Sequence, residues 1–259
     1  MSAAFEAPTF KAYEPDRSLV GKLRRRWVRL YGRRQARGGG PGRPRLSISF
    51  DDAPISAATT GAEIMAAHGA KATYFISAGL IDQDGPMAPY AGWSDIQRLH
   101  AQGHEIGCHT FGHVDLGQAN AQAAEDCVTE NRQAFEAHDI PAAVTFAYPY
   151  GDVAAGPKAV LAPRFALMRA LHNGLVEPGA DLNQAPSVGL EGPSGESDAM
   201  TWLAKAAERN AWLILNAHDV QASPSPWGCT PETLDRVMRR AEELGFDVIT
   251  VSEGARQAA

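Results

Sequence analysis

The chain has 259 residues, of which 44% are hydrophobic and 21% charged, a composition typical of a globular protein that buries one barrel-sized core. It contains no uninterrupted apolar run of about 18 residues and no apolar leader, so we expect neither a membrane-spanning helix nor a secretory signal. Cys108, Cys127 and Cys229 form no CxxC pair, which argues against a disulfide framework or a zinc ribbon and favours a cytoplasmic location.

The net charge of −6 is unevenly distributed along the chain. Residues 1–45 contain 12 Lys and Arg against 3 Asp and Glu, whereas the rest of the chain contains 12 against 27. In this arm Val20, Leu23, Trp27 and Leu30 recur at helical spacing among arginines, which predicts a basic amphipathic helix. The helix either contacts an anionic membrane or polymer, making the protein peripheral to the membrane, or packs its apolar side on the acidic body.

The sequence divides into the basic arm, residues 1–45, which ends in a glycine-rich hinge at 38–42, and a body, residues 46–259. In the body, short β-like runs alternate with helical patterns, which is typical of parallel βαβ units. Glycines follow several of these helices where a left-handed cap would lie. Strands are expected at 46–50, 71–77, 105–109, 144–148, 165–170, 212–217 and 247–251, and helices at 57–68, 94–102, 118–138, 154–161, 198–210 and 231–244.

Polar clusters follow directly after four of the expected strands. They are Asp51-Asp52, His109–His113, Tyr148–Tyr150 and His218-Asp219. About seven βα units fit either a barrel or a doubly wound sheet. In a parallel barrel the strand ends converge on one face, where active sites are built. We therefore expect an α/β barrel of about seven parallel strands with its active site on that face.

Two of these clusters together form a candidate metal site. His109 and His113 are four residues apart, so in a helical turn both imidazoles would face one ion. Thr110 occupies the position where zincins carry a glutamate base, so the base and a third ligand must come from elsewhere. Asp51 and Asp52 supply both, because paired carboxylates repel each other without a cation and one can accept a proton from metal-bound water. A helix N-cap is the alternative reading of this pair.

The other two clusters supply candidates for the remaining steps of a hydrolysis. Pro149 fixes a turn in which the Tyr150 amide N–H can face a developing oxyanion, although YPYG is also an ordinary turn. His218 ends an apolar strand, where it can protonate a leaving amine, although a lone histidine there is more often structural. The sequence contains no GxSxG nucleophile elbow, so a serine hydrolase is not expected. Cys108 is disfavoured as a nucleophile, because in an extended segment its side chain would point away from His109.

In order and character, the four clusters resemble the polysaccharide deacetylase (NodB-like) family, carbohydrate esterase family four. Phe50-Asp51-Asp52 looks like its first motif, in which the first aspartate is the base and the second binds metal. His109–His113 matches its H-[ST]-x-x-H metal motif. Pro149-Tyr150-Gly151 matches the end of its third motif, and His218 matches its last, catalytic histidine. The resemblance runs from about residue 46 to 253 and implies a distorted (β/α) barrel.

The resemblance also implies an activity and a cofactor. Asp52, His109 and His113 would hold one divalent ion, Zn²⁺ or else Co²⁺ or Ni²⁺, with Asp51 as base and His218 as acid. The reaction would remove an N-acetyl group from an amino sugar of a poly- or oligosaccharide. The expected partner is an N-acetylated glycan and not a nucleic acid, with the oligomeric state left open. The alternatives are a metal-dependent amidase or deformylase on a non-polymeric or lipid-linked substrate, and a non-catalytic glycan-binding barrel.

The sequence departs from the family pattern at three places. Where the family has an arginine that braces the catalytic aspartate, this chain has Ala147, and Arg169 is the candidate replacement. The family's DxxDW element has no match, although Asp181 lies in its region. Asn216 stands where the family has a leucine that contacts the acetyl methyl group. The resulting acyl pocket would be more polar and would weaken the preference for acetyl over other acyl groups by ~1–3 kcal/mol. The candidates for substrate contact are Tyr148, Pro149, Asn216 and Trp227.

Overall fold

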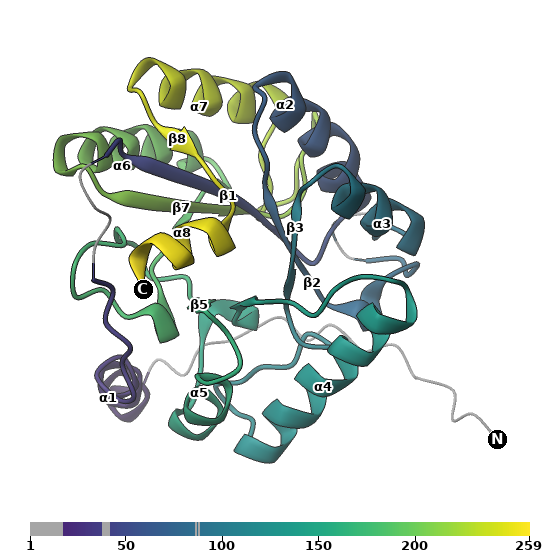
Figure 1. Cartoon of the computed structure of the whole chain (residues 1–259), viewed down its shortest axis with the longest axis vertical. Coiled ribbons are helices and arrows are strands. Elements are labelled where there is room, and N and C mark those ends of the chain that lie inside the picture. The colour runs from purple at the N-terminus through teal and green to yellow at the C-terminus, as the bar shows by residue number, and fades with distance from the viewer. Residues whose placement is uncertain (1–17, 38–41, 86, 88) are drawn as a thin grey trace.

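The strands form one sheet in which neighbours pair in parallel (Figure 1). The computed structural model describes residues 18–37, 42–85, 87 and 89–259. The strands are β1 (Arg45–Asp51), β2 (Thr73–Ile76), β3 (Glu105–Cys108), β4 (Thr145–Ala147), β5 (Leu167–Arg169), β6 (Val188–Gly189), β7 (Trp212–Ala217) and β8 (Asp247–Val248). Their order is β5-β4-β3-β2-β1-β7-β6, and β8 also pairs with β1.

This strand order is that of a distorted barrel. Around the barrel the strands run β1 to β5 in chain order, and β6 and β7 return to β1 from the other side. Among the described strands, the one pair of neighbours that does not hydrogen-bond is β5 and β6, which leaves an opening there. A doubly wound sheet would instead reverse its direction at a switch point. At the opening, Arg169 forms a parallel bridge with Ala185, and Val176 forms an antiparallel bridge with Trp212. Irregular backbone thus stands where a closing strand pair would be, and the expected fold class is confirmed.

Helices cover both faces of the sheet (Figure 1). They are α1 (Leu19–Val28), α2 (Ala62–Ala67), α3 (Trp93–Ala101), α4 (Ala121–Ala137), α5 (Ala155–Leu161), α6 (Gly195–Arg209), α7 (Pro231–Glu243) and α8 (Val251–Ala258). On β7, Leu213 and Leu215 join the core that contains the outer helices, whereas Trp212 and Ile214 join the one that contains α8. Because both faces are covered, β1 and β7 read as nearly continuous buried runs.

The expected strands and helices all occur, with ends that differ by a few residues. The segment expected as one helix at 57–68 begins as a π-helical turn, Ala57–Gly61, before α2. Glycines in the left-handed conformation follow α2, α3 and α7, as expected. The sequence did not predict β6 or α8. β6 has only two residues, and the buried side of the eight-residue α8 carries small residues, which give a weak apolar signal in the sequence.

The helix of the arm is attached to the barrel through a buried lysine. Lys158 of α5 is fully buried, and its ammonium donates to the Val28 carbonyl at 2.9 Å, to Asp181 at 2.6 Å and to Gln184 at 3.2 Å. Val28 itself packs in the core beside β4 and α5. After the helix, Arg34 donates to the backbone carbonyls of residues 162, 165 and 166. Residues 18–37 are therefore bound to the body at several points.

The apolar stripe of α1 does not make this attachment. Val20, Leu23, Trp27 and Leu30 are exposed, while the residues of α1 that face the barrel are Gly21 and Val28. The expectation that the stripe packs on the body is therefore wrong, because the contact uses a different side of the helix. The expected glycine hinge lies outside the described residues except for Gly42. Among the described helices, none is long and apolar enough to cross a membrane.

We predict that Lys158→Met destabilises the fold. The substitution leaves the Asp181 carboxylate buried without its cation and frees the Val28 carbonyl, and breaking a buried pair from one side typically costs about 3–5 kcal/mol. Urea unfolding measures the change. As a control, Arg132→Met removes an exposed ion pair within α4 and should change the unfolding free energy by less than about 1 kcal/mol. Equal effects of the two substitutions would contradict the structural role of Lys158.

Candidate active site

Two adjacent carboxylates lie at the end of the central strand. Asp51 is the last residue of β1, and Asp52 follows it with a positive φ of 62°. Successive residues of a strand point to opposite faces, so a regular continuation would separate the two side chains. The left-handed turn instead ends the strand at Asp52, whose amide N–H donates to the Phe75 carbonyl at 3.0 Å. Such conformations of non-glycine residues concentrate at functional sites.

The two histidines meet Asp52 at this edge. Asp52 Oδ1 lies 3.6 Å from His109 Nε2 and 3.4 Å from His113 Nε2. The helical turn expected for residues 109–113 is wrong, because Thr110 and His113 have positive φ of 64° and 53°. The segment is a loop after β3, held where the Phe111 amide donates to the Cys127 carbonyl at 3.1 Å. The imidazoles therefore converge through loop geometry.

These three side chains fit a divalent metal ion. One ligand atom from each of Asp52, His109 and His113 lies within 4.8 Å of the others. Asp52 Oδ1 and His113 Nδ1 are buried and have no hydrogen-bond partner among the described residues, as expected of a site that binds another group. The Nδ1 of His109 is 2.8 Å from the Ala147 carbonyl, which orients its Nε2 toward the centre.

The protonation of the three groups agrees with metal binding. Burial lowers the pKa of His109 and of His113 to about 4, so both imidazoles are neutral near pH 7, the form that binds metal. Burial likewise raises the pKa of Asp52, more than the nearby imidazoles lower it. A buried carboxylate in this position needs a cation nearby to stay ionised. With three protein ligands, the site leaves a coordination position open, which is typical of catalytic rather than structural zinc sites.

Arg169 neutralises the other carboxylate. Its Nη2 donates to Asp51 Oδ2, and the guanidinium, itself fully buried, lies 5.3 Å from the Phe75 ring centroid. Arg169 on β5 is the register partner of Ala147 on β4, so the cation reaches Asp51 from the strand next to the position where the family has its arginine. Burial would raise the pKa of Asp51, but Arg169 and the imidazoles outweigh it and lower that pKa. Asp51 Oδ1 has no hydrogen-bond partner among the described residues.

His218 lies just beyond the end of β7 beside an acidic residue that the sequence did not single out. Its Nδ1 is 3.2 Å from the Trp227 carbonyl and 3.6 Å from Glu191 Oε2. Burial lowers the pKa of His218, but Glu191, Asp51 and Asp52 together raise it to about 9. The imidazole is therefore protonated near pH 7, and with Nδ1 directed to Trp227 and Glu191, its Nε2 is left to give up a proton.

Asp181, which lies in the region of the family's DxxDW element, has a different function. It accepts from Lys158 Nζ at 2.6 Å and from the Arg34 amide at 3.0 Å, and so holds the arm. Glu191 provides the carboxylate beside His218 instead. The sequence could have indicated Glu191 only through its position just after a strand. That strand, β6, has two residues and is too short to predict.

The expected substrate contacts divide into two groups. Tyr148 and Pro149 are buried, and the Tyr148 hydroxyl donates to the Asn183 carbonyl at 2.9 Å. Tyr148 follows β4 and packs in a core cluster with Phe146, and the expected contact of both residues with substrate stays a prediction. Tyr150 follows with φ of 59°, and its ring lies 4.6 Å from that of His113. The proposed use of its amide N–H stays a prediction.

Asn216 and Trp227 lie on the same side of the molecule as His218. Asn216 is buried on β7, accepts from Ser187 Oγ at 2.8 Å, and has no partner for Nδ2 among the described residues. The side chain of Trp227 is 49% exposed, while its backbone carbonyl holds His218. The expected contacts of Asn216 and Trp227 with substrate stay predictions.

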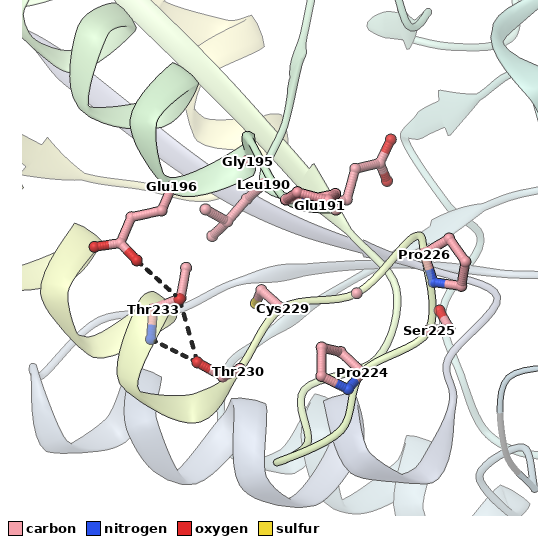
Figure 2. Close-up of a pocket in the computed structure, with 13 residues that line it drawn as sticks. Leu190, Glu191, Gly195, Glu196, Pro224, Ser225, Pro226, Cys229, Thr230 and Thr233 are labelled. Atoms are coloured by element: carbon pink, nitrogen blue, oxygen red, sulfur yellow. Dashed lines mark hydrogen bonds between the residues drawn. The ribbon is translucent and has the colours of Figure 1, made fainter.

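A pocket of about 540 Å³ is lined in part by Glu191, the acidic neighbour of His218 (Figure 2). Glu191 belongs to its lining, and in Figure 2 its carboxylate points away from Thr233 and Glu196 at the other end. There Thr233 donates to Glu196 at 3.1 Å. None of the three candidate metal ligands lines this pocket. It is therefore a space beside Glu191 that is separate from the candidate metal ligands.

The buried thiol next to the metal site is not a nucleophile. Cys108 accepts from Asn131 Nδ2 at 3.2 Å, and burial raises its pKa to about 12. The thiolate, which is the reactive form, is thus scarce near pH 7. This agrees with the expectation from the sequence.

Comparison with known proteins points to the same family. Residues 38–162 match the family model described as polysaccharide deacetylase, a segment that contains the two aspartates, both histidines and Tyr150. Over these residues, the chain is similar to the polysaccharide deacetylase family. The match confirms the resemblance inferred from the motifs. Residues 163–259, which carry Arg169, Glu191 and His218, lie beyond the matched segment.

Relatives and solved structures extend this result. The chain is 30% identical over 85 residues to a chitin deacetylase of Pestalotiopsis sp, covering 33% of this chain and 27% of that protein. It is 33% identical over 96 residues to a chitooligosaccharide deacetylase of Sinorhizobium fredii, covering 37% and 41%. The aligned part thus spans less than half of these polysaccharide deacetylases.

The fold is shared over a longer stretch. The structure of the chitin deacetylase from Colletotrichum lindemuthianum superposes with a TM-score of 0.59 at 17% identity, covering 83% of this chain and 88% of that one. At this identity the likeness concerns the fold. The shared fold covers more of this chain than the segment matched in sequence.

We predict that the wild-type protein binds about one Zn²⁺ and that Asp52→Ala or His113→Ala weakens this binding by about 100-fold or more. Each substitution removes one of three ligand atoms while leaving the surrounding strands intact. Isothermal titration calorimetry of chelator-treated protein gives the affinity and stoichiometry. His100→Ala, on the exposed side of α3, is the control and should bind as the wild type does. Unchanged affinity in both ligand variants would refute the site.

We predict that Glu191→Gln lowers the pKa of His218. A carboxylate 3.6 Å from Nδ1 stabilises the imidazolium, so its neutralisation lets the proton leave at a lower pH. If protonated His218 is required, the alkaline limb of the pH–rate profile moves to lower pH. Proton NMR of the imidazole measures the same pKa without turnover. Glu196→Gln, in the same pocket but paired with Arg236, should leave the limb in place.

Proposed function

We propose that this protein is a metal-dependent hydrolase that removes an N-acetyl group from an amino sugar of a poly- or oligosaccharide. The observation that carries the proposal is the division of work between the adjacent aspartates. Asp52 faces the two neutral histidines, whereas Asp51 is held by Arg169 and keeps one oxygen without a partner among the described residues. A structural metal site would not need the second carboxylate.

A divalent ion held by Asp52, His109 and His113 would acidify a water molecule and polarise the carbonyl of the amide. Asp51 is the base that takes the proton of the attacking water, at Oδ1. Arg169 holds the opposite oxygen and keeps the carboxylate ionised, since its charge lowers the pKa of Asp51. Arg169 therefore positions the base and does not itself contact the reacting atoms.

His218 is the acid in this proposal. Breaking the C–N bond of an amide requires a proton on the leaving nitrogen, because an unprotonated amide anion is a very poor leaving group. A pKa raised to about 9 supplies that proton near pH 7, and Glu191 keeps the ring oriented. The base and the acid thus have pKa values pushed in opposite directions by their surroundings, which is the arrangement that acid–base catalysis uses.

The substrate class rests on the relatives and on the surroundings of His218. The relatives are named as deacetylases of chitin and chitooligosaccharide, both N-acetylated glycans. The exposed Trp227 stands between Pro226 and Gly228, which line the pocket together with Glu191, so this region offers an aromatic surface and space for neighbouring sugar units. Asn216 makes the acyl side of the site more polar than a leucine would, which widens the range of acyl groups that fit.

The alternatives have less support. A non-catalytic glycan-binding barrel would not require a buried Arg169 on Asp51 or an ion pair on His218, both of which the structure contains. An amidase or deformylase acting on a small substrate would use the same centre. The relatives act on glycans by their names, which favours the deacetylase.

The experiment is acetate release from N-acetylated chitooligosaccharides. We expect chelator to abolish activity, zinc to restore it, and Asp51→Asn to reduce kcat by about 10²- to 10⁴-fold, the usual contribution of a general base. Asp139→Asn, an exposed aspartate on the far side of α4, is the matched control. Zinc content should stay unchanged in Asp51→Asn, so a loss of activity with metal still bound isolates the base. Full activity without metal would refute the proposal.

A further inference from the structure

Among the described residues, the exposed large apolar side chains are concentrated on α1 and the turn that follows it. Of the nine large hydrophobic side chains described as exposed, six lie between residues 19 and 31. Leu19, Val20, Leu23, Trp27 and Leu30 are 55–77% exposed. Tyr31 stacks on Trp27 with ring centroids 4.9 Å apart. These six residues, which we call the α1 stripe, form a contiguous patch of the kind that marks an interaction site.

The stripe is surrounded by positive charge. Residues 18–37 contain eight Lys and Arg and no Asp or Glu. Within the described part of the chain, Arg24 is the cation of this segment that lies near a carboxylate of the body, 3.7 Å from Asp152. Lys22, Arg26 and Arg29 are exposed and make no ion pair with a described residue. An apolar stripe flanked by cations is the pattern of a helix that lies in a membrane interface.

The orientation of the stripe is determined by the opposite side of the helix. Val28 is buried beside β4 and α5, and its carbonyl accepts from the fully buried Lys158. Asn183 donates to the Gly32 carbonyl just after the helix at 2.8 Å. Figure 1 shows α1 at the outer edge of the barrel, next to α5. Turning the stripe onto the body would break these buried contacts, so it faces outward.

We propose that the α1 stripe docks on the surface of an anionic lipid bilayer. A polyanion alone would neutralise the arginines but leave Leu23 and Trp27 in water. A symmetric contact between the α1 stripes of two copies would bring eight cations against eight cations without a carboxylate from either segment between them. A bilayer with anionic headgroups satisfies both features, because leucines insert among the acyl chains, Trp and Tyr favour the interface, and arginines meet phosphates. α1 is ten residues long, so it lies on the surface and does not span it.

Docking has a consequence for the catalytic centre. Arg24 of α1 contacts Asp152, two residues beyond Tyr150, whose ring packs on His113. The contact between Arg24 and Asp152 therefore joins α1 to the loop that carries Tyr150 beside the candidate metal site. A docked α1 holds that rim close to the lipid surface.

The test is co-sedimentation of the full chain with vesicles of phosphatidylcholine, with and without phosphatidylglycerol. We expect binding to the anionic vesicles at least about tenfold tighter than to the neutral ones, and weaker binding at high salt. The double variant Leu23→Ser and Trp27→Ser keeps every charge and should lose about tenfold or more in affinity. Val144→Ser, at a 50% exposed apolar residue of the body, is the control and should bind as the wild type does.

Heparin binding separates the bilayer from a polyanion. The double variant should bind heparin as tightly as the wild type, because its arginines are intact. Wild-type binding to heparin but not to anionic vesicles would overturn the proposal, and so would equal vesicle binding by the double variant. A wild-type dimer that the double variant dissociates would assign the stripe to a second copy instead. Acetate release from a soluble oligosaccharide should be unchanged in the double variant, so this test and that of the hydrolase fail independently.

Discussion

The structure depends on the burial of two adjacent carboxylates at the end of its central strand. Asp51 and Asp52 would repel each other, and burial disfavours the charge of each. Arg169 on β5 forms an ion pair with Asp51, and two neutral histidines lie beside Asp52. The distinct surroundings give two chemically equal residues different protonation behaviour. Most of the surrounding architecture positions the groups that resolve this repulsion.

Those groups come from distant parts of the chain and meet because all the strands run in the same direction. β1, β3, β4, β5 and β7 each end at one edge, and each delivers a residue there. The backbone at this edge is irregular, with Asp52, Ala53, Thr110, His113 and Tyr150 all in the left-handed region. Regular strands would send neighbouring side chains to opposite faces, so the unusual backbone is what lets successive residues serve one site.

The arm adds a second level of organisation. Lys158 and Asp181, a pair buried between α1 and the barrel, turn the helix so that its apolar stripe faces away from the protein. Asp181 thus links the arm to the segment that completes the barrel near β6. A residue considered for the catalytic machinery belongs to this attachment. The buried ammonium of Lys158 therefore determines which side of α1 faces solvent.

Much of the fold and of the centre could be read from the sequence, because both rest on local patterns. The apolar runs after which Asp51, His109 and His218 appear are continuous, so the strands and their terminal polar residues were evident, and metal ligands cluster at recognisable spacing. What the sequence could not supply depends on register and on loop shape. Arg169 faces Asp51 because β5 pairs with β4 in one register, and Glu191 faces His218 because a two-residue strand places it there.

The sequence by itself determined the barrel, the meeting of Asp52 with His109 and His113, and the amphipathic character of the arm. Each of these features depends on residues that are close together in the chain or that recur with a fixed period. Only the tertiary structure decided that residues 109–113 form a loop, that Tyr148 is buried, that Glu191 and not Asp181 accompanies His218, and that the α1 stripe faces solvent. These depend on which surfaces meet across long separations in sequence, where packing and buried charge outweigh local preference.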